Sequence, residues 1–157
     1  MRKALACLFI FGALVFAQAP AGQRGGRGGR GGAGPKRKVL LAPVNVNTGD
    51  IAWKVPLGIT DSLAEDKQKT GRPNIGGSIA TAGGLVFVGA TDDSRFRAFD
   101  AKTGKELWIA KLNGSASAVP SAYQGKDGKQ YVVVTGTGGG LAGAPLTSDE
   151  ITAFSLP

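Results

Sequence analysis

The chain has 157 residues, of which 19 are basic and 11 acidic, giving a formal charge of +8. It has no histidine and a single cysteine, Cys7. Histidine-based proton transfer, histidine-activated nucleophiles and intrachain disulfides are therefore excluded, as are most transition-metal sites.

The N-terminal residues have the pattern of a secretory signal peptide. Arg2 and Lys3 precede an apolar run over residues 4–17. A run of roughly 14 residues is shorter than the ~20 needed to cross a bilayer, so a transmembrane anchor is the less favoured alternative. We expect residues 1–17 to be a signal peptide that is removed together with Cys7. The mature protein is then periplasmic or secreted and has no membrane span.

Residues 18–38 form an Arg- and Gly-rich segment without a large apolar side chain. Such a segment buries too little surface to offset the entropy of ordering its backbone, so we expect a disordered linker. The leader and the linker hold eight basic residues, which leaves 11 basic and 11 acidic residues from Val39 onward. Arg-Gly-Gly repeats also occur in RNA-binding proteins, but with three repeats and no aromatic residue we expect no nucleic-acid partner.

From Val39 onward, short β-branched runs alternate with Gly, Asp and Pro, which is typical of β-strands joined by tight turns. No segment predicts a helix of useful length. We expect turns at residues 81–84, 92–94 and 125–128, since Gly and Asp tolerate positive φ, and a long polar loop at residues 58–75. The fold class is all-β and antiparallel, with strands at residues 39–46, 51–56, 78–82, 85–89, 95–100, 107–111, 117–123, 130–135 and 150–155.

A repeat of 55 residues runs through this region. It relates Asn-Val-Asn-Thr-Gly-Asp-Ile-Ala-Trp at 45–53 to Asp-Ala-Lys-Thr-Gly-Lys-Glu-Leu-Trp at 100–108. In each copy the Asx and Thr side chains can bond turn amides, the Gly supplies a left-handed residue, and the Trp enters the next strand as a flat apolar plate. A fixed period of this length predicts units that bury their apolar faces only against a neighbour. The chain is then a slice of a larger architecture, with Trp53 and Trp108 packed between adjacent sheets.

Five motifs in this region occur together in one known family. They are Asn-Ile-Gly-Gly-Ser at 74–78, Thr-Ala-Gly-Gly-Leu-Val-Phe-Val-Gly at 81–89, the string at 97–108, Gly-Lys-Asp-Gly-Lys-Gln-Tyr-Val-Val-Val at 125–134, and Ile-Thr-Ala-Phe-Ser-Leu-Pro at 151–157. In these motifs residues 44–157 resemble the C-terminal end of the pyrroloquinoline quinone (PQQ) dependent dehydrogenases, in particular the glucose-dehydrogenase-like branch. The string ending at Trp108 resembles the tryptophan-docking repeat of that family, whose fold is an eight-bladed β-propeller.

The resemblance implies that residues 39–157 form a partial propeller of about two blades. Two strands would be the outer half of one blade, the next four a whole antiparallel blade, and the last three part of another. Family members oxidise alcohols or sugars by passing two electrons to PQQ, with a calcium ion polarising the quinone and an aspartate acting as base. Those calcium ligands and that base belong to blades absent from this chain. We therefore assign no catalytic residue and no metal ligand, and we expect the acidic side chains to be solvated turn residues.

Two positions of the family near the cofactor map onto this sequence. The first is Ile75 with Gly76, where the alcohol-oxidising branch has Trp in place of Ile75. The second is the glycine-rich loop at residues 136–141, in which Gly139, Gly140 and Leu141 replace a Trp or His of the family. Amides of residues 138–140 could cradle the carboxylates of PQQ, and a flexible turn is the alternative.

Two functional hypotheses follow. In the first, the chain supplies the C-terminal blades of an exported PQQ-dependent sugar or alcohol dehydrogenase and is inactive without the catalytic blades. In the second, it is a periplasmic binding or scaffold module that keeps the propeller strands for protein contacts and binds no cofactor. Both predict complementary blades or self-association, because an open slice exposes sheet faces and an unpaired edge.

Overall fold

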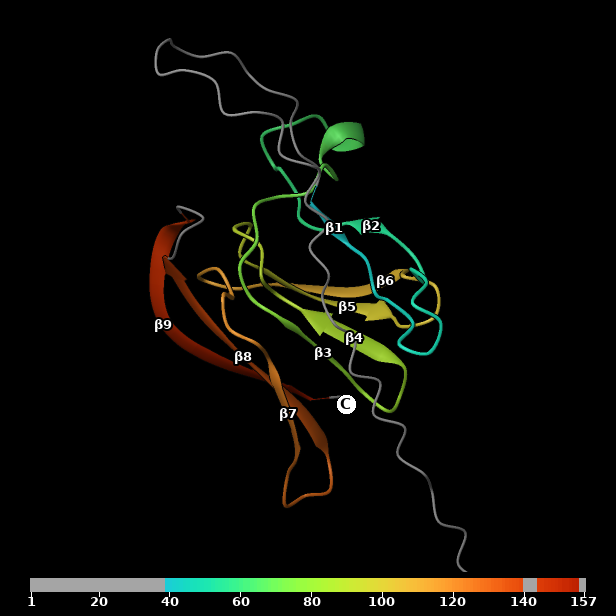
Figure 1. Cartoon of the computed structure of the whole chain (residues 1–157). Helices are drawn as coiled ribbons and strands as arrows, with labels where there is room; N and C mark the ends of the chain where they lie inside the picture. The colour runs from blue at the N-terminus through green and yellow to red at the C-terminus, as the bar shows by residue number, and fades with distance from the viewer. Residues whose placement is uncertain (1–38, 140–143, 156–157) are drawn as a thin grey trace, which may run out of the picture.

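The computed structural model describes residues 39–139 and 144–155, and this part of the chain is built from strands and one short 3₁₀ helix (Figure 1). The signal peptide expected at residues 1–17, the linker expected at 18–38, Gly140 and Leu141 lie outside the described residues. The all-β prediction is confirmed. The elements are β1 (Leu40–Leu41), β2 (Val55–Pro56), η1 (Glu65–Lys67), β3 (Ser78–Ala80), β4 (Leu85–Val88), β5 (Arg95–Asp100), β6 (Glu106–Lys111), β7 (Ser121–Gln124), β8 (Gln130–Gly139) and β9 (Ala144–Ser155).

The strands form three antiparallel sheets in which consecutive strands pair. The orders are β1-β2, β3-β4-β5-β6 and β7-β8-β9, which is the predicted grouping of two, four and three strands. The predicted hairpin turns follow from glycine. Gly84 and Gly128 have φ of +82° and +80°. The amide of each donates to the carbonyl oxygen of the residue three positions earlier, with an N···O distance of 3.0 Å.

The first apolar core lies between the β1-β2 sheet and the four-stranded sheet. Alternation along β4 and β5 turns Val88 and Phe99 toward this face, where both are buried against Leu41. Trp53 packs against the same core. Its Nε1 donates to the carbonyl oxygen of Ala101 at 2.9 Å, and its ring stacks on Phe99 with centroids 6.3 Å apart. One indole therefore joins the two sheets by packing and by a hydrogen bond.

The second core lies between the four-stranded sheet and the β7-β8-β9 sheet. At its centre Phe96 is fully buried, with its ring centroid 5.8 Å from that of Phe154 and 6.1 Å from that of Trp108. Trp108 and Phe154 meet edge to face at 4.9 Å. Trp108 and Phe154 follow Trp53 and Phe99 at the 55-residue offset. The same two residue types therefore pack at both interfaces, stacked in the first and edge to face in the second.

The repeated turns have the local structure that their residues predict. Asp100 Oδ1 accepts the amide hydrogen of Thr103 at 2.7 Å and its hydroxyl hydrogen at 2.8 Å, and these bonds lower the pKa of Asp100. In the earlier copy, Asn45 Oδ1 accepts the amide hydrogen two residues ahead at 2.9 Å. Gly49 and Gly104 have φ of +78° and +72°. The glycines are needed because L side chains disfavour this region.

Some strand lengths differ from the prediction. β1 and β2 have two residues each, since Pro43 lacks an amide hydrogen and the ladder resumes only as a bridge between Val44 and Ile51. β8 is longer than expected. It continues through Gly139 in what was expected to be a glycine-rich loop, because glycine accommodates the register shifts between β8 and β9 over residues 136–139.

The polar segment at residues 58–75 is a long loop, as expected, and hydrogen bonds join its two ends. At its neck, the amides of Gly71 and Arg72 donate to the carbonyl oxygens of Gly58 and Leu57 at 3.3 and 2.8 Å. A Cβ on Gly71 would lie 2.5 Å from the carbonyl oxygen of Val39, so only glycine allows the chain to pass here. The short helix η1 forms the far part of the loop (Figure 1).

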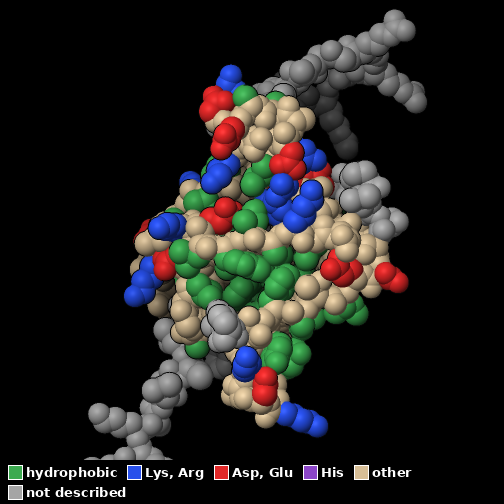
Figure 2. Space-filling view, turned by 180° about the vertical axis from the view of Figure 1, so that it is seen from behind, with side chains coloured by type: hydrophobic (Ala, Val, Ile, Leu, Met, Phe, Trp, Pro, Cys, Tyr) green, Lys and Arg blue, Asp and Glu red, His purple; other side chains and the backbone are tan. Residues whose placement is uncertain are grey.

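One face of the molecule gathers hydrophobic side chains at its centre, framed by charged groups (Figure 2). Alternation along the last sheet places Tyr123, Tyr131, Val133 and Ile151 on the side turned away from the second core, and Ile151 is 70% exposed. An apolar sheet face of this kind is typical of an interaction surface. No helix of the described residues is long and apolar enough to cross a membrane.

Candidate functional site

Three connecting segments meet at one end of the sheets. They are the residues before β3, the loop between β4 and β5, and the connection from β6 to β7. Backbone hydrogen bonds join them through the middle segment. Ile75 donates to the carbonyl oxygen of Ala90 at 2.8 Å, Asp92 donates to that of Pro73 at 3.2 Å, and Ala90 donates to that of Ala116 at 2.7 Å. The β4-β5 loop, residues 89–94, therefore supports both neighbours.

Ile75 and Gly76, which we expected to face a cofactor, lie at this junction. The Ile75 residue is 38% exposed and so presents apolar surface. Gly76 has φ of +143°, and a Cβ there would lie 3.1 Å from the carbonyl oxygen of Ser117 and 3.2 Å from Cα of Ala90. A side chain at this position would push the segments apart, so the close packing depends on glycine.

The second expected cofactor position begins in β8. The amide of Gly138 donates to the carbonyl oxygen of Ser115 at 3.0 Å, so it is already bonded and is not free to bind an anion. Gly139 is paired with Ala144 in the β8-β9 ladder. The glycine-rich segment is thus β-strand through Gly139. The Gly138 amide is therefore not available for the binding of PQQ carboxylates that the sequence suggested for residues 138–140.

Ser115 connects the two expected positions. Its carbonyl oxygen binds Gly138, and Ser117 two residues later approaches Gly76. The Ser115 hydroxyl is buried and has no hydrogen-bond partner among the described residues. A buried polar atom without a partner costs free energy and calls for an explanation. An exposed Ile75, a bare Gly76 and a hydroxyl with unused bonding capacity fit the edge of a flat, oxygen-rich ligand.

A buried ion pair lies beside this junction. Asp93 and Arg97 form a salt bridge, with side chains 2% and 1% exposed. Asp93 also accepts hydrogen bonds from the Thr91 hydroxyl at 2.6 Å and from the Ile59 amide at 2.8 Å. Arg97 Nε lies 3.3 Å from a carboxylate oxygen of Glu106. Both buried charges are therefore partnered, as the low polarity of the interior requires.

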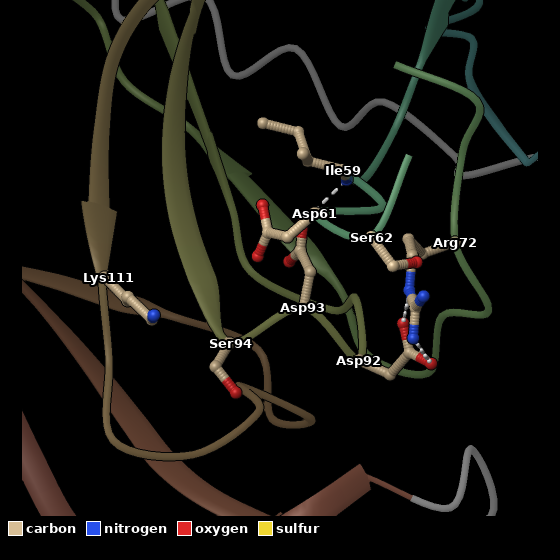
Figure 3. A pocket seen from close by; sticks show the side chains of 8 residues that line it. All are labelled: Ile59, Asp61, Ser62, Arg72, Asp92, Asp93, Ser94 and Lys111. Carbon is tan, nitrogen blue, oxygen red and sulfur yellow. Dashed lines mark hydrogen bonds and ion pairs between the residues drawn. The ribbon is translucent and has the colours of Figure 1, made fainter. Parts of the chain in front are cut away.

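A pocket of about 300 Å³ is lined by both members of a second ion pair, Arg72 and Asp92, and by Asp61 of a third (Figure 3). Arg72 donates two hydrogen bonds to Asp92, at 2.6 and 2.7 Å, and Arg95 donates two to Asp61, at 2.9 and 3.0 Å. Lys111 enters the pocket from β6. With the bond from Ile59 to Asp93, these pairs fasten the loop at residues 58–75 to the segment that leads into β5.

The expectation that acidic side chains are solvated is wrong for two of them. The side chains of Asp92 and Asp93 are 8% and 2% exposed, because Arg72 and Arg97 supply the counter-charge that water would otherwise supply. The sequence holds one signal for this network. Arg97 lies between Phe96 and Ala98 in a strand and so shares a face with Phe99; a charge on an inward face requires a buried counter-ion.

The Asp93 carboxyl should titrate below its ordinary range. Burial raises the pKa of Asp93, but hydrogen bonds and charge from Arg97, with hydrogen bonds from Thr91 and Ile59, lower it by more. A carboxyl group whose pKa is lower in the folded state than in the unfolded state stabilises the folded state at pH values above the unfolded-state pKa. This stabilisation is lost as the pH falls through the folded-state pKa. We expect the free energy of unfolding to decrease as the pH drops from about 5 through 4 and below. Carboxyl-carbon NMR titration checks this, and an Asp93 midpoint at or above the ordinary value would contradict it.

The sequence matches a known protein family. A family model described as PQQ: Glucose/ethanol/alcohol dehydrogenase, beta-propeller domain, matches residues 40–132. Quinoprotein glucose dehydrogenase A of Acinetobacter calcoaceticus is 43% identical over 122 residues, which cover 74% of this chain and 15% of that protein. Lupanine 17-hydroxylase [cytochrome c] of Pseudomonas sp is 47% identical over 95 residues, which cover 59% of this chain and 12% of that protein.

A solved structure shows the same fold. The crystal structure of quinohemoprotein alcohol dehydrogenase from Comamonas testosteroni superposes with a TM-score of 0.57 at 30% identity, over 78% of this chain and 17% of that one. The chain spans about 15% of the length of the curated relatives that it matches. The three sheets correspond to β-propeller blades, as predicted.

Proposed function

The chain belongs to the PQQ-dependent glucose, ethanol and alcohol dehydrogenase β-propeller family, and from this membership we propose that it supplies C-terminal blades of a dehydrogenase that oxidises a sugar or an alcohol. One structural observation supports a particular cofactor site in this chain. Ile75 with Gly76, and Gly138, meet on either side of residues 115–117, beside a buried hydroxyl without a partner among the described residues. Ile75 and Gly76 are the first place where the family resemblance implies cofactor-facing residues, and Gly138 leads directly into Gly139, Gly140 and Leu141, the second such place.

PQQ would supply a quinone that accepts two electrons from the substrate. In this chain Ile75 would offer apolar surface to the flat cofactor, and Gly76 would keep the blade edge free of a side chain. The Ser115 hydroxyl would gain the hydrogen bond that it lacks among the described residues. No residue described here stands in a family motif for the base or for calcium, so we propose that both come from complementary blades.

We further propose that the protein is exported and acts in the periplasm or outside the cell. Residues 1–17 support this through their basic start and short apolar run, and residues 18–38 would form the linker to the propeller blades at 39–157. The proposed partners are complementary blades or a second copy of the chain. The exposed apolar face of the last sheet supports this, since burying it stabilises an assembly.

The test is complementation. We expect the chain mixed with the remaining blades of quinoprotein glucose dehydrogenase A to retain PQQ on equilibrium dialysis and to reduce a dye with glucose or an alcohol. The chain alone should show no dye reduction. Ile75→Lys should weaken PQQ retention at least about tenfold, because a charge replaces apolar contact surface. Val46→Lys is the matched control, since Val46 is exposed in the β1-β2 turn at the far end of the sheets.

Two results would contradict the proposal in different ways. PQQ-dependent dye reduction by the chain alone would show that complementary blades are not needed. Stable assembly with a partner that retains no PQQ would favour the scaffold alternative.

A further inference from the structure

The β4-β5 loop that supports Ile75 and Gly76 has a strained backbone. Ala90 and Ser94 have φ of +62° and +54°, a left-handed conformation that residues with a Cβ disfavour. Such residues keep this conformation only where the surroundings enforce it, and they cluster at functional sites. The strain is adjacent to the site, because Ala90 accepts the hydrogen bond from Ile75 and lies against Gly76.

The buried ion pair enforces the shape of this loop. Thr91 and Asp93, which lie between the two strained residues, are bonded to each other and to Arg97. Arg97 belongs to β5, a central strand of the four-stranded sheet, and its guanidinium also contacts Glu106 on β6. The loop is therefore fixed to a rigid part of the sheet through one buried side chain.

The loop passes this constraint on to the candidate cofactor position. Residues 90–92 bind residues 73–75 through two backbone hydrogen bonds, which together form the β-bridge between Asn74 and Thr91. Asp93 also accepts a hydrogen bond from the Ile59 amide, and Asp92 binds Arg72, so the β4-β5 loop also holds the chain at two points that precede residues 73–75. Displacement of the β4-β5 loop would thus move Ile75 and Gly76.

We propose that Arg97 and Asp93 are positioning residues that hold Ile75 and Gly76 at the blade edge by enforcing the strained β4-β5 loop. Their relevance to a cofactor rests on the proposed function above, but their effect on the position of Ile75 does not. A purely structural ion pair would stabilise the whole chain equally. A positioning pair protects one segment selectively, and relief of the backbone strain compensates for its loss.

Hydrogen exchange of backbone amides in the full chain distinguishes these cases. In Asp93→Asn we expect exchange at the Ile75 and Ile59 amides to accelerate at least about tenfold, because both bonds depend on the loop. Exchange at Val132 and Val134 in β8 should change less than about threefold. Adding Ser94→Gly, which removes the cost of one left-handed residue, should restore at least half of the lost protection at Ile75 on a logarithmic scale.

Glu106→Gln is the matched control. It alters the other partner of Arg97 but leaves Asp93 and the loop, so the Ile75 amide should exchange as in the unaltered chain. Equal acceleration at all amides, unchanged exchange at Ile75, or no recovery on adding Ser94→Gly would each overturn the inference. In the assembled protein, unaltered PQQ affinity of Asp93→Asn would overturn it while leaving the proposed function in place. Absence of PQQ binding by the unaltered assembly would overturn the function alone.

Discussion

Phe96→Ala should lower the free energy of unfolding by about 3–5 kcal/mol, the range for removing a fully buried aromatic ring. Phe96 is 0% exposed and its ring lies within 6.1 Å, centroid to centroid, of those of Phe87, Trp108 and Phe154. These rings come from both sheets of the second core, so the cavity would open in the middle of the interface. Urea denaturation followed by circular dichroism measures the loss.

Ile151→Ala provides the comparison on the open face of the last sheet. Ile151 is 70% exposed, and a substitution there should change the free energy of unfolding by no more than about 0.5 kcal/mol. Similar losses for the two variants would mean that the second core does not form in solution. A large loss for Ile151→Ala alone would mean that the open face is covered, and measurement at several protein concentrations would show whether a second copy covers it.

The second large effect concerns the glycines of the repeated turns. Gly104→Ala should lower the free energy of unfolding by about 3 kcal/mol or more, and Gly49→Ala by about 1–2 kcal/mol. Both residues have left-handed φ, so both substitutions carry the backbone cost. Only at Gly104 would the new Cβ collide with a neighbour, at 2.5 Å from Cε3 of Trp53, whereas nothing lies within 4 Å at Gly49. The difference between the variants therefore isolates the contact between indole and turn.

Tryptophan fluorescence during urea denaturation provides the measurement for this pair. We expect the native-state emission of Gly104→Ala to shift, because Trp53 must move from its stack on Phe99 and from its bond to Ala101. Gly49→Ala should keep the native emission. Equal losses of stability with no spectral change would show that the indole does not press on the turn.

The strands and turns of this chain were predictable because they depend on local chemistry. Alternation in residues 95–100 places Phe96 and Phe99 on opposite faces, and each face became a core. Gly84, Gly104 and Gly128 adopt the positive φ that their turns require. The 55-residue repeat indicated stacked units, because Trp53 and Trp108 recur at the same distance from the turn glycines Gly49 and Gly104.

Ladder lengths were less predictable, because they depend on what lies opposite. β8 extends through Gly139 since β9 pairs with it, although glycine-rich sequence by itself indicates a loop. β1 and β2 are short because Pro43 removes an amide donor from the ladder and the pairing resumes only at the bridge between Val44 and Ile51. The boundary errors thus arise from pairing, not from local preference.

The sequence by itself determined an all-β chain of repeated units, since strand alternation, glycine turns and the spacing of two tryptophans are properties of neighbouring residues. Only the tertiary structure decided that Asp92 and Asp93 are buried, because the loop at residues 58–75 brings Arg72 to Asp92 and the Ile59 amide to Asp93, whose ion-pair partner Arg97 is a near neighbour in sequence. It likewise brought Ile75 to the loop that Arg97 holds. Charges that meet across the fold leave little trace in sequence, since Coulomb energy depends on distance in space and not on distance along the chain.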